Sequence, residues 1–222
     1  MGVGVGAVLV DVLPVALGIA ASPFPIIPAI LLLFTARAKA TSSSFLLGWV
    51  VGILVATGLF AALAEVLDTS DQPAVWATWA RIVLGAVLVV LGVRQWLGRE
   101  AKESAPRWMQ SLADATPATA LRLGLVLSAA NPKILLLTAA GGLAIGSSEL
   151  DAAGVALAVA LFTVVAASTV AIPVLLYLVR GERILGPLGV ARDWLQANNA
   201  AVMAVVIVVI GVLLLVKGLG AL

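Results

Sequence analysis

The chain has 222 residues, of which 63% are hydrophobic and 11% charged, and its formal net charge is +2. Its mean hydropathy of +1.19 excludes an ordinary soluble domain, since such domains contain about 45 to 50% apolar residues. The lack of cysteine and histidine excludes disulfides, thiolate or imidazole metal sites and the commonest catalytic base, and the small net charge argues against nucleic-acid binding.

Long apolar segments predict an all-α integral membrane protein, because about 20 apolar residues are needed to cross a bilayer. The expected transmembrane helices are six: residues 5–34, 43–67, 75–97, 118–146, 152–179 and 199–220. The first is expected to be retained and not cleaved as a signal peptide, because it starts without Lys or Arg and stays apolar to Phe34. We expect one membrane domain over 1–222, composed of repeat 1 (1–97), a cytoplasmic amphipathic connector (98–117) and repeat 2 (118–222).

The first and fourth segments share a pattern, Ala20-Ala21-Ser22-Pro23 and Ala129-Ala130-Asn131-Pro132. Proline removes a backbone hydrogen bond from a helix, so both segments are predicted to be broken there. The matching halves indicate a duplication, and three spans per half would make the two repeats inverted. Paired breaks of this kind often form the binding site of a transporter, although a kink that only shapes the helix is the alternative.

Charge alternates between the connections of the predicted spans. Three connections are basic and carry Arg37, Lys39, Arg99, Lys102, Arg107, Arg180, Arg183 and Arg192. The other two are acidic and carry Glu65, Asp68, Asp71, Glu149 and Asp151. The positive-inside rule therefore predicts that both termini lie outside the cell membrane.

Small residues recur along the second and third segments at helical spacing. They are Ser44, Gly48, Gly52 and Ala56 in the second segment, and Gly85 and Gly92 in the third. Small side chains let helices approach closely in a membrane, so these residues are predicted to serve helix packing. In the fifth segment Pro173 is expected to act as a hinge, with Ser168 and Thr169 bonding the carbonyls that it frees.

Two cytoplasmic stretches are predicted to be amphipathic and to lie along the inner membrane surface. One surrounds Trp108 and Leu112. The other places Ile184, Leu188, Ala191 and Leu195 on one face, opposite Arg192, Asp193 and Gln196. Loop anchoring is the simpler interpretation, and docking of a partner is the alternative.

Lys133 falls near the centre of the fourth segment, where an ionised lysine is unfavourable by about 2.5 to 3.5 kcal/mol. No acidic residue is expected at that depth, because Asp11 falls near the outer end of the first segment. A polar or anionic headgroup on the cargo would balance the charge; a lysine that snorkels or is neutral inside the fold is the alternative. The candidate substrate-binding residues are Ser22, Pro23, Phe24, Asn131, Pro132 and Lys133.

Two motifs carry a resemblance to known families. Asn131-Pro132-Lys133, at the opening of the second half, resembles the lysine-exporter superfamily. Within it, the stretch from Ala21 to Pro28 and the stretch from Phe45 to Trp49 resemble the glycopeptidolipid- and sulfolipid-addressing proteins of mycobacteria and related actinobacteria. The resemblance implies a protein of the inner membrane that assists export of large glycolipids alongside a large lipid transporter.

We therefore expect an exporter of a polar or anionic (glyco)lipid that needs no cofactor or metal. Membrane lipids and the substrate are the expected partners, and self-association is left open. One alternative is an exporter of amino acids or small metabolites, as elsewhere in the superfamily; another is a non-transporting scaffold for a larger lipid exporter. An enzyme is not expected, because no base, nucleophile pair or metal set is visible in the sequence.

Overall fold

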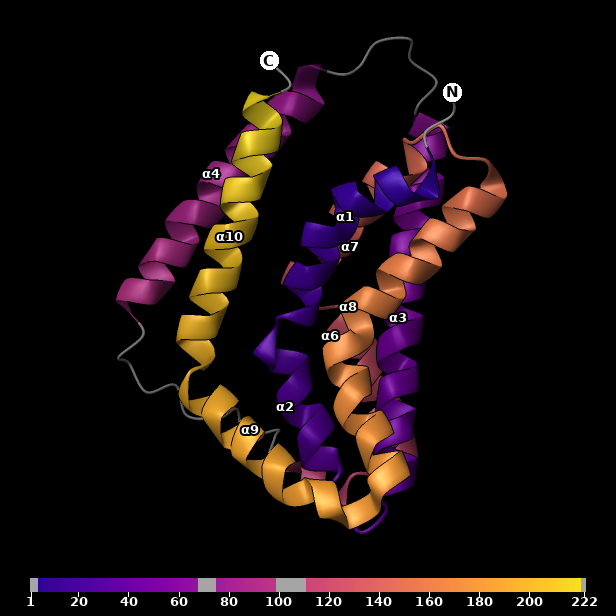
Figure 1. Ribbon diagram of the computed structural model, residues 1–222, viewed down its shortest axis with the longest axis vertical. Helices are drawn as coiled ribbons and strands as arrows, with labels where there is room; N and C mark the ends of the chain where they lie inside the picture. Colours follow the sequence, from indigo (N-terminus) through magenta and orange to yellow (C-terminus); the bar gives the residue numbers. More distant parts are fainter. Residues whose placement is uncertain (1–3, 68–74, 99–110, 221–222) are drawn as a thin grey trace.

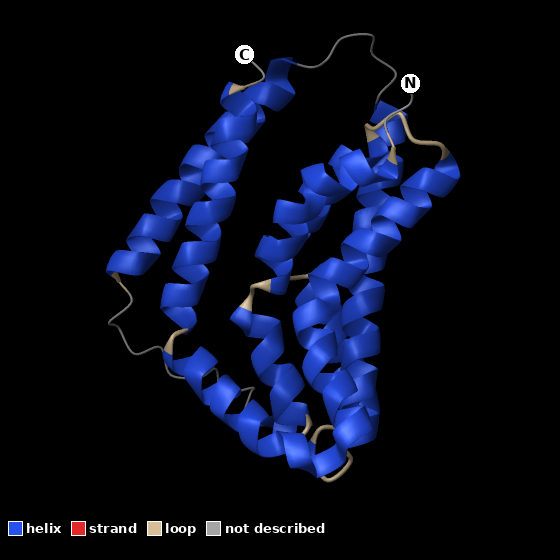
Figure 2. Ribbon diagram, in the orientation of Figure 1, coloured by secondary structure: helices blue, strands red, loops and turns tan. Residues whose placement is uncertain are grey.

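The computed structural model describes residues 4–67, 75–98 and 111–220. Within these ranges all regular secondary structure is helical (Figure 2). The α-helices are α1 (Val5–Ala20), α2 (Pro23–Leu32), α3 (Ala38–Leu67), α4 (Val75–Leu97), α6 (Pro117–Ala129), α7 (Pro132–Gly146), α8 (Ala152–Arg180), α9 (Leu185–Ala197) and α10 (Asn199–Leu219). Two short 3-10 helices, η1 (Ser111–Asp114) and η2 (Gly181–Ile184), precede α6 and α9.

The helices form a bundle with a separate flanking pair. Helices α1, α2, α3, α6, α7 and α8 pack together, whereas α4 and α10 lie side by side along one flank (Figure 1). Helix α9 runs across one end of the molecule and joins α8 to α10, and α1 begins and α10 ends at the opposite end. The pair α4–α10 packs extensively on itself and only sparsely on the bundle.

Apolar helices of sufficient length make the chain a membrane protein. Among the described residues, α3 and α8 are each long and apolar enough to cross a membrane, with mean hydropathies of 2.3 and 2.5 in their candidate spans. Four segments qualify if each bent pair, α1–α2 and α6–α7, counts as one span. Helices α4 and α10 contribute shorter apolar stretches, so length and apolarity alone support two to four of the six predicted crossings.

Both predicted helix breaks are present. The chain bends by 54° between α1 and α2 and by 63° between α6 and α7. The residue before each proline is extended, with φ and ψ of −75° and 116° at Ser22 and −76° and 117° at Asn131. A residue before proline is pushed out of the helical region by clash with the ring, which explains why the two breaks have nearly the same backbone geometry.

The proline-rich segment after the first break forms one continuous helix. Pro23 and Pro25 occupy the first turn of α2, where backbone N–H groups have no helical acceptor, and the helix continues through Pro28. Helix α8 likewise continues through Pro173. The expected rebonding around Pro173 is not observed: Ser168 donates to the carbonyl of Val165, and Thr169 donates to the carbonyl of Ala20. Thr169 thus satisfies the end of α1 at the first break.

Glycines allow the closest contacts between helices. A Cβ placed on Gly48 or Gly52 of α3 would collide with Leu121 or Ser128 of α6. In the flanking pair, a Cβ on Gly85 would stand 2.8 Å from the carbonyl oxygen of Gly211, and one on Gly211 would stand 2.8 Å from that of Gly85. The remaining small residues of the predicted set lie on the same helices: Gly92 and Ala56 are buried and Ser44 is half-buried.

The predicted amphipathic stretches are only partly described. Trp108 lies outside the described residues, and Leu112 in η1 is buried in the main core. On the other stretch, Ile184 and Leu188 pack against a small cluster at the ends of α2, α3 and α8 that consists of Leu33, Ala38 and Tyr177. This part of η2 and α9 therefore packs on the protein itself.

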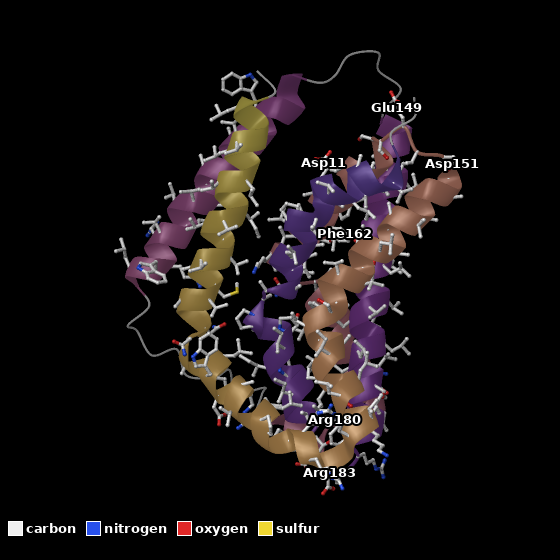
Figure 3. The ribbon with its side chains drawn as sticks, viewed as in Figure 1. Asp11, Glu149, Asp151, Phe162, Arg180 and Arg183 are labelled. Atoms are coloured by element: carbon white, nitrogen blue, oxygen red, sulfur yellow. The ribbon has the colours of Figure 1, made fainter. Side chains whose placement is uncertain are left out.

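The two ends of the bundle differ in charge. Asp11, Glu149 and Asp151 lie at one end, and Arg180 and Arg183 lie at the other (Figure 3). Further exposed basic residues are Arg37 and Lys39 at the start of α3, Arg94 at the end of α4 and Arg122 near the start of α6. The charge asymmetry seen in the sequence is thus a property of the folded molecule.

Candidate substrate-binding site

The two helix breaks meet at one side chain of α10. The hydroxyl Oγ of Ser22, at the first break, is 3.8 Å from the Sδ atom of Met203. The Nζ atom of Lys133, in the first turn of α7 after the second break, is 3.5 Å from the same sulfur. Segments far apart in the sequence therefore bring a hydroxyl and an amine to one thioether.

Lys133 is positioned by the local structure of the second break. The side chain of Asn131 accepts a hydrogen bond of 3.0 Å from the backbone N–H of Lys133 and so caps the N-terminus of α7. Pro132 occupies the first helical position, where its missing N–H costs nothing. This arrangement fixes the backbone from which the Lys133 side chain reaches towards α10.

Ser22 occupies the position at the first break that Asn131 occupies at the second, but its side chain does not cap the following helix. It is 1% exposed, and its side chain makes no capping bond to α2. The end of α1 is satisfied instead by Thr169 of α8, which donates to the carbonyl of Ala20. The Ser22 hydroxyl is therefore available for a partner on α10 or for a ligand in its place.

The amine of Lys133 is poorly satisfied by its surroundings. It is half-buried, and no carboxylate pairs with it within the described part of the chain. Its hydrogen-bond acceptor is the Met203 thioether, and thioether sulfur is a weak acceptor. The site can therefore offer a hydroxyl and an amine to a stronger acceptor, such as the oxygens of an anionic group.

The other predicted site residues contribute in different ways. Pro23 is buried in α2, and Phe24 is partly buried against the main core. Asn131 is half-buried and acts as the helix cap, while Pro132 is exposed. The structure thus brings Ser22 and Lys133 together at Met203. Asn131, Pro23 and Pro132 instead determine the backbone geometry of the two breaks.

Met203 is absent from the residues that the sequence singled out. It lies in the first turns of an Ala/Val-rich segment and looks like any apolar residue of a span. A thioether carries no charge and no strong polar signal, so its role depends on packing between α10 and the two breaks. A contact between distant elements of this kind leaves no periodic or motif signal in the sequence.

The meeting point of the breaks is covered by α10. Two surface cavities lie elsewhere: one of about 420 Å³ between α3, the end of α7 and the start of α8, and one of about 270 Å³ between the end of α4, α9 and α10. Small residues such as Gly58 and Ala61 line the first, and Trp96 and Trp194 line the second. Neither cavity includes Ser22, Lys133 or Met203.

Comparison with known protein families identifies the family of the chain. A family model described as Sap, sulfolipid-1-addressing protein, matches residues 12–220. The matched region includes both helix breaks, Lys133 and Met203. No curated protein and no solved structure matches the chain.

Proposed function

Because the chain belongs to the sulfolipid-1-addressing protein family, we propose that it is a membrane transporter or exporter that assists the movement of a polar or anionic (glyco)lipid across the bacterial inner membrane. The observation that carries this proposal is the junction of the two breaks, where Ser22 and Lys133 both face Met203. An anionic headgroup would supply the oxygen acceptors that the thioether lacks. Ser22 would donate its hydroxyl, and Lys133 would provide the positive charge.

The same proposal assigns the membrane topology. Each bent pair would cross once, as would α3, α8, α4 and α10, giving six crossings as two inverted repeats of the kind found in many secondary transporters. The matched backbone of Ser22 and Asn131 and the reciprocal contact of Gly85 with Gly211 support equivalent halves. The end with Arg180 and Arg183 would face the cytoplasm, and both termini would lie outside.

Binding in the breaks suits a transporter for a physical reason. A broken helix exposes backbone groups and short polar side chains at membrane depth, where an intact helix would expose none. Here the polar groups come from both halves of the chain and meet at one place. Relative movement of the two halves would therefore change access to the bound group while the site itself stays in place.

Mass spectrometry of lipids and metabolites that copurify with the protein tests the proposal. We expect anionic lipids to copurify with the unmodified protein and to fall about tenfold in the Lys133→Ala variant, since a hydrogen bond to a charged group contributes about 1.5 to 3 kcal/mol. The matched control is Lys39→Ala, which removes an exposed lysine from the first turn of α3 and should leave the lipid content unchanged.

Other outcomes would favour the alternative functions. Copurification of amino acids that depends on Lys133, with no lipid enrichment, would indicate an exporter of small metabolites. Identical lipid and metabolite content in the unmodified and Lys133→Ala proteins would contradict a ligand role for Lys133. Reconstituted protein that moves no substrate unless a larger lipid exporter is present would indicate a scaffold.

A further inference from the structure

Met203 covers the meeting point of the two breaks from a pair of helices that packs separately from the bundle. We propose that Met203 is the gate residue of the substrate site: its sulfur occupies the place of a ligand oxygen, and α4–α10 must move as a unit to expose Ser22 and Lys133 together. This inference rests on the site described under the proposed function. It adds the residue that determines access to that site.

The flanking pair is built to move as one body. At the crossing of α4 and α10, Gly85 and Gly211 bring the two backbones into mutual contact. Further along the same pair, a Cβ on Gly92 of α4 would stand 2.6 Å from Val208 Cγ2 and 3.0 Å from the carbonyl oxygen of Ala204, both on α10. Backbones this close interlock along their length, so displacement of α10 carries α4 with it.

The pair α4–α10 contacts the bundle at few places. Ile210 of α10 lies against Gly18 of α1, where a Cβ would stand 3.1 Å from Ile210 Cγ1. Met203, about two turns earlier on α10, contacts Ser22 and Lys133. Helix α10 packs on α1 and α2 far less than on α4. The thioether is thus the polar contact that holds α10 against the breaks, beside the apolar contact of Ile210, which is buried in the main core.

The chemistry of the contact explains how a ligand would open it. Sδ lies 3.8 Å from the Ser22 hydroxyl and 3.5 Å from the Lys133 amine. The Ser22 hydroxyl has one proton to donate, so an oxygen that accepts this proton displaces the sulfur. An anionic oxygen accepts hydrogen bonds more strongly than a thioether. Binding at Ser22 and Lys133 and closure by Met203 are therefore mutually exclusive, and a ligand that prefers the open form shifts the population towards it.

Distance measurements between spin labels test the gate. The chain has no native cysteine, so spin labels attach only where a cysteine is introduced. Suitable positions are Leu54→Cys on α3 and Val209→Cys on α10, whose native side chains are 40% and 51% exposed, respectively. Double electron–electron resonance in phosphatidylcholine nanodiscs would compare the labelled parent with Met203→Leu and Met203→Glu in the same background. Met203→Leu preserves the side-chain volume, which limits disturbance of the fold.

The gate predicts opposite shifts for the two variants. Met203→Leu removes the acceptor and should raise the ratio of open to closed molecules about twofold, the low end of the effect of losing one hydrogen bond, because a thioether is a weak acceptor. Met203→Glu places a carboxylate opposite Lys133 and should abolish the open population. The same distance distribution in all three proteins would overturn the proposal.

Repeating the measurement in phosphatidylglycerol nanodiscs separates the gate from the cargo. If anionic lipid raises the open population of the parent but not of a Lys133→Ala version, both the gate and the anionic ligand are supported. If the Met203 variants shift the distances while the lipid has no effect, the gate is supported and the proposed anionic cargo is contradicted. If the lipid opens the parent and the Met203 variants do not differ, Met203 is not the gate residue.

Discussion

For Lys133 and Ser22, the contacts made in the fold determine which hydrogen-bonding groups remain available for a ligand. Ser22 precedes the proline of the first break and carries a hydroxyl, whereas Lys133 follows the proline of the second break and carries an amine. These two different donors, a hydroxyl and an amine, both contact Met203 on α10 and so lie at one site. Among the described residues, the Lys133 amine finds only a thioether as acceptor and so keeps unused hydrogen-bonding capacity, which is the physical basis for proposing a ligand at this place.

Thr169 gives a residue-scale prediction about the first break. Its hydroxyl donates to the carbonyl of Ala20, one of the carbonyls that the end of α1 leaves without a helical partner. Replacement by the isosteric valine should lower the free energy of unfolding by about 1 to 3 kcal/mol, because a buried acceptor loses its donor. Thermal unfolding in detergent measures the change.

Ser168 provides the matched control for that prediction. Its hydroxyl donates within its own helix to the carbonyl of Val165, so Ser168→Ala leaves the break untouched. We expect it to change stability much less than Thr169→Val. Equal effects of the two substitutions would show that the Thr169 contact does not support α1.

At the scale of the element, the glycines of α3 explain how the bundle packs around the breaks. Gly48 and Gly52 leave room for α6, and Gly142 of α7 lies against the carbonyl of Thr57. These contacts place α6 and α7, and with them the second break, against α3. Close backbone approach of this kind is available only where a side chain is absent or very small.

Helix α3 also carries an internal test of this packing. A Cβ at Gly48 would collide with the Leu121 carbonyl and stand 3.1 Å from the Leu125 nitrogen, whereas a Cβ at Gly58 has nothing within 4 Å. Gly48→Ala should therefore destabilise the protein by about 1 to 3 kcal/mol. Gly58→Ala should be neutral or stabilising by up to about 1 kcal/mol, since alanine favours a helix. Thermal unfolding of both variants is the measurement, and equal melting temperatures would contradict the packing account.

The elements differ in how well the sequence predicts them. The breaks before Pro23 and Pro132 follow from local sterics, so their positions are readable from the chain. The role of Thr169 and the inward packing of Leu188 on α9 are not, because they depend on which helix end lies nearby in space. Met203 was missed for the same reason: its contacts join α10 to two distant breaks.

At the scale of the whole molecule, charge distinguishes the two ends of the bundle, and packing distinguishes the bundle from the helix pair beside it. Along the bundle, acidic residues such as Glu149 lie at one end and basic residues such as Arg183 at the other. Across it, the pair α4–α10 lies beside the bundle of α1, α2, α3, α6, α7 and α8. By the positive-inside rule, the first division predicts the orientation of the protein in the membrane. The second division defines the body whose movement the gate proposal requires.

Cysteine labelling tests the orientation. Asp151→Cys at the acidic end and Arg183→Cys at the basic end lie at opposite ends of the molecule, in a chain without native cysteine. By the positive-inside rule, a membrane-impermeant maleimide should label the Asp151→Cys variant in intact cells and the Arg183→Cys variant only after permeabilisation. The reverse pattern would place both termini in the cytoplasm.

The central claim is that the two breaks form one site, and a double-mutant cycle on ligand binding tests it most directly. Binding of phosphatidylglycerol by native mass spectrometry would be compared for the unmodified protein, Ser22→Ala, Lys133→Ala and the double variant. If Ser22 and Lys133 hold the same headgroup, their losses should be non-additive, with a coupling energy of about 0.5 to 3 kcal/mol. Strictly additive losses, or no loss from either substitution, would contradict the claim.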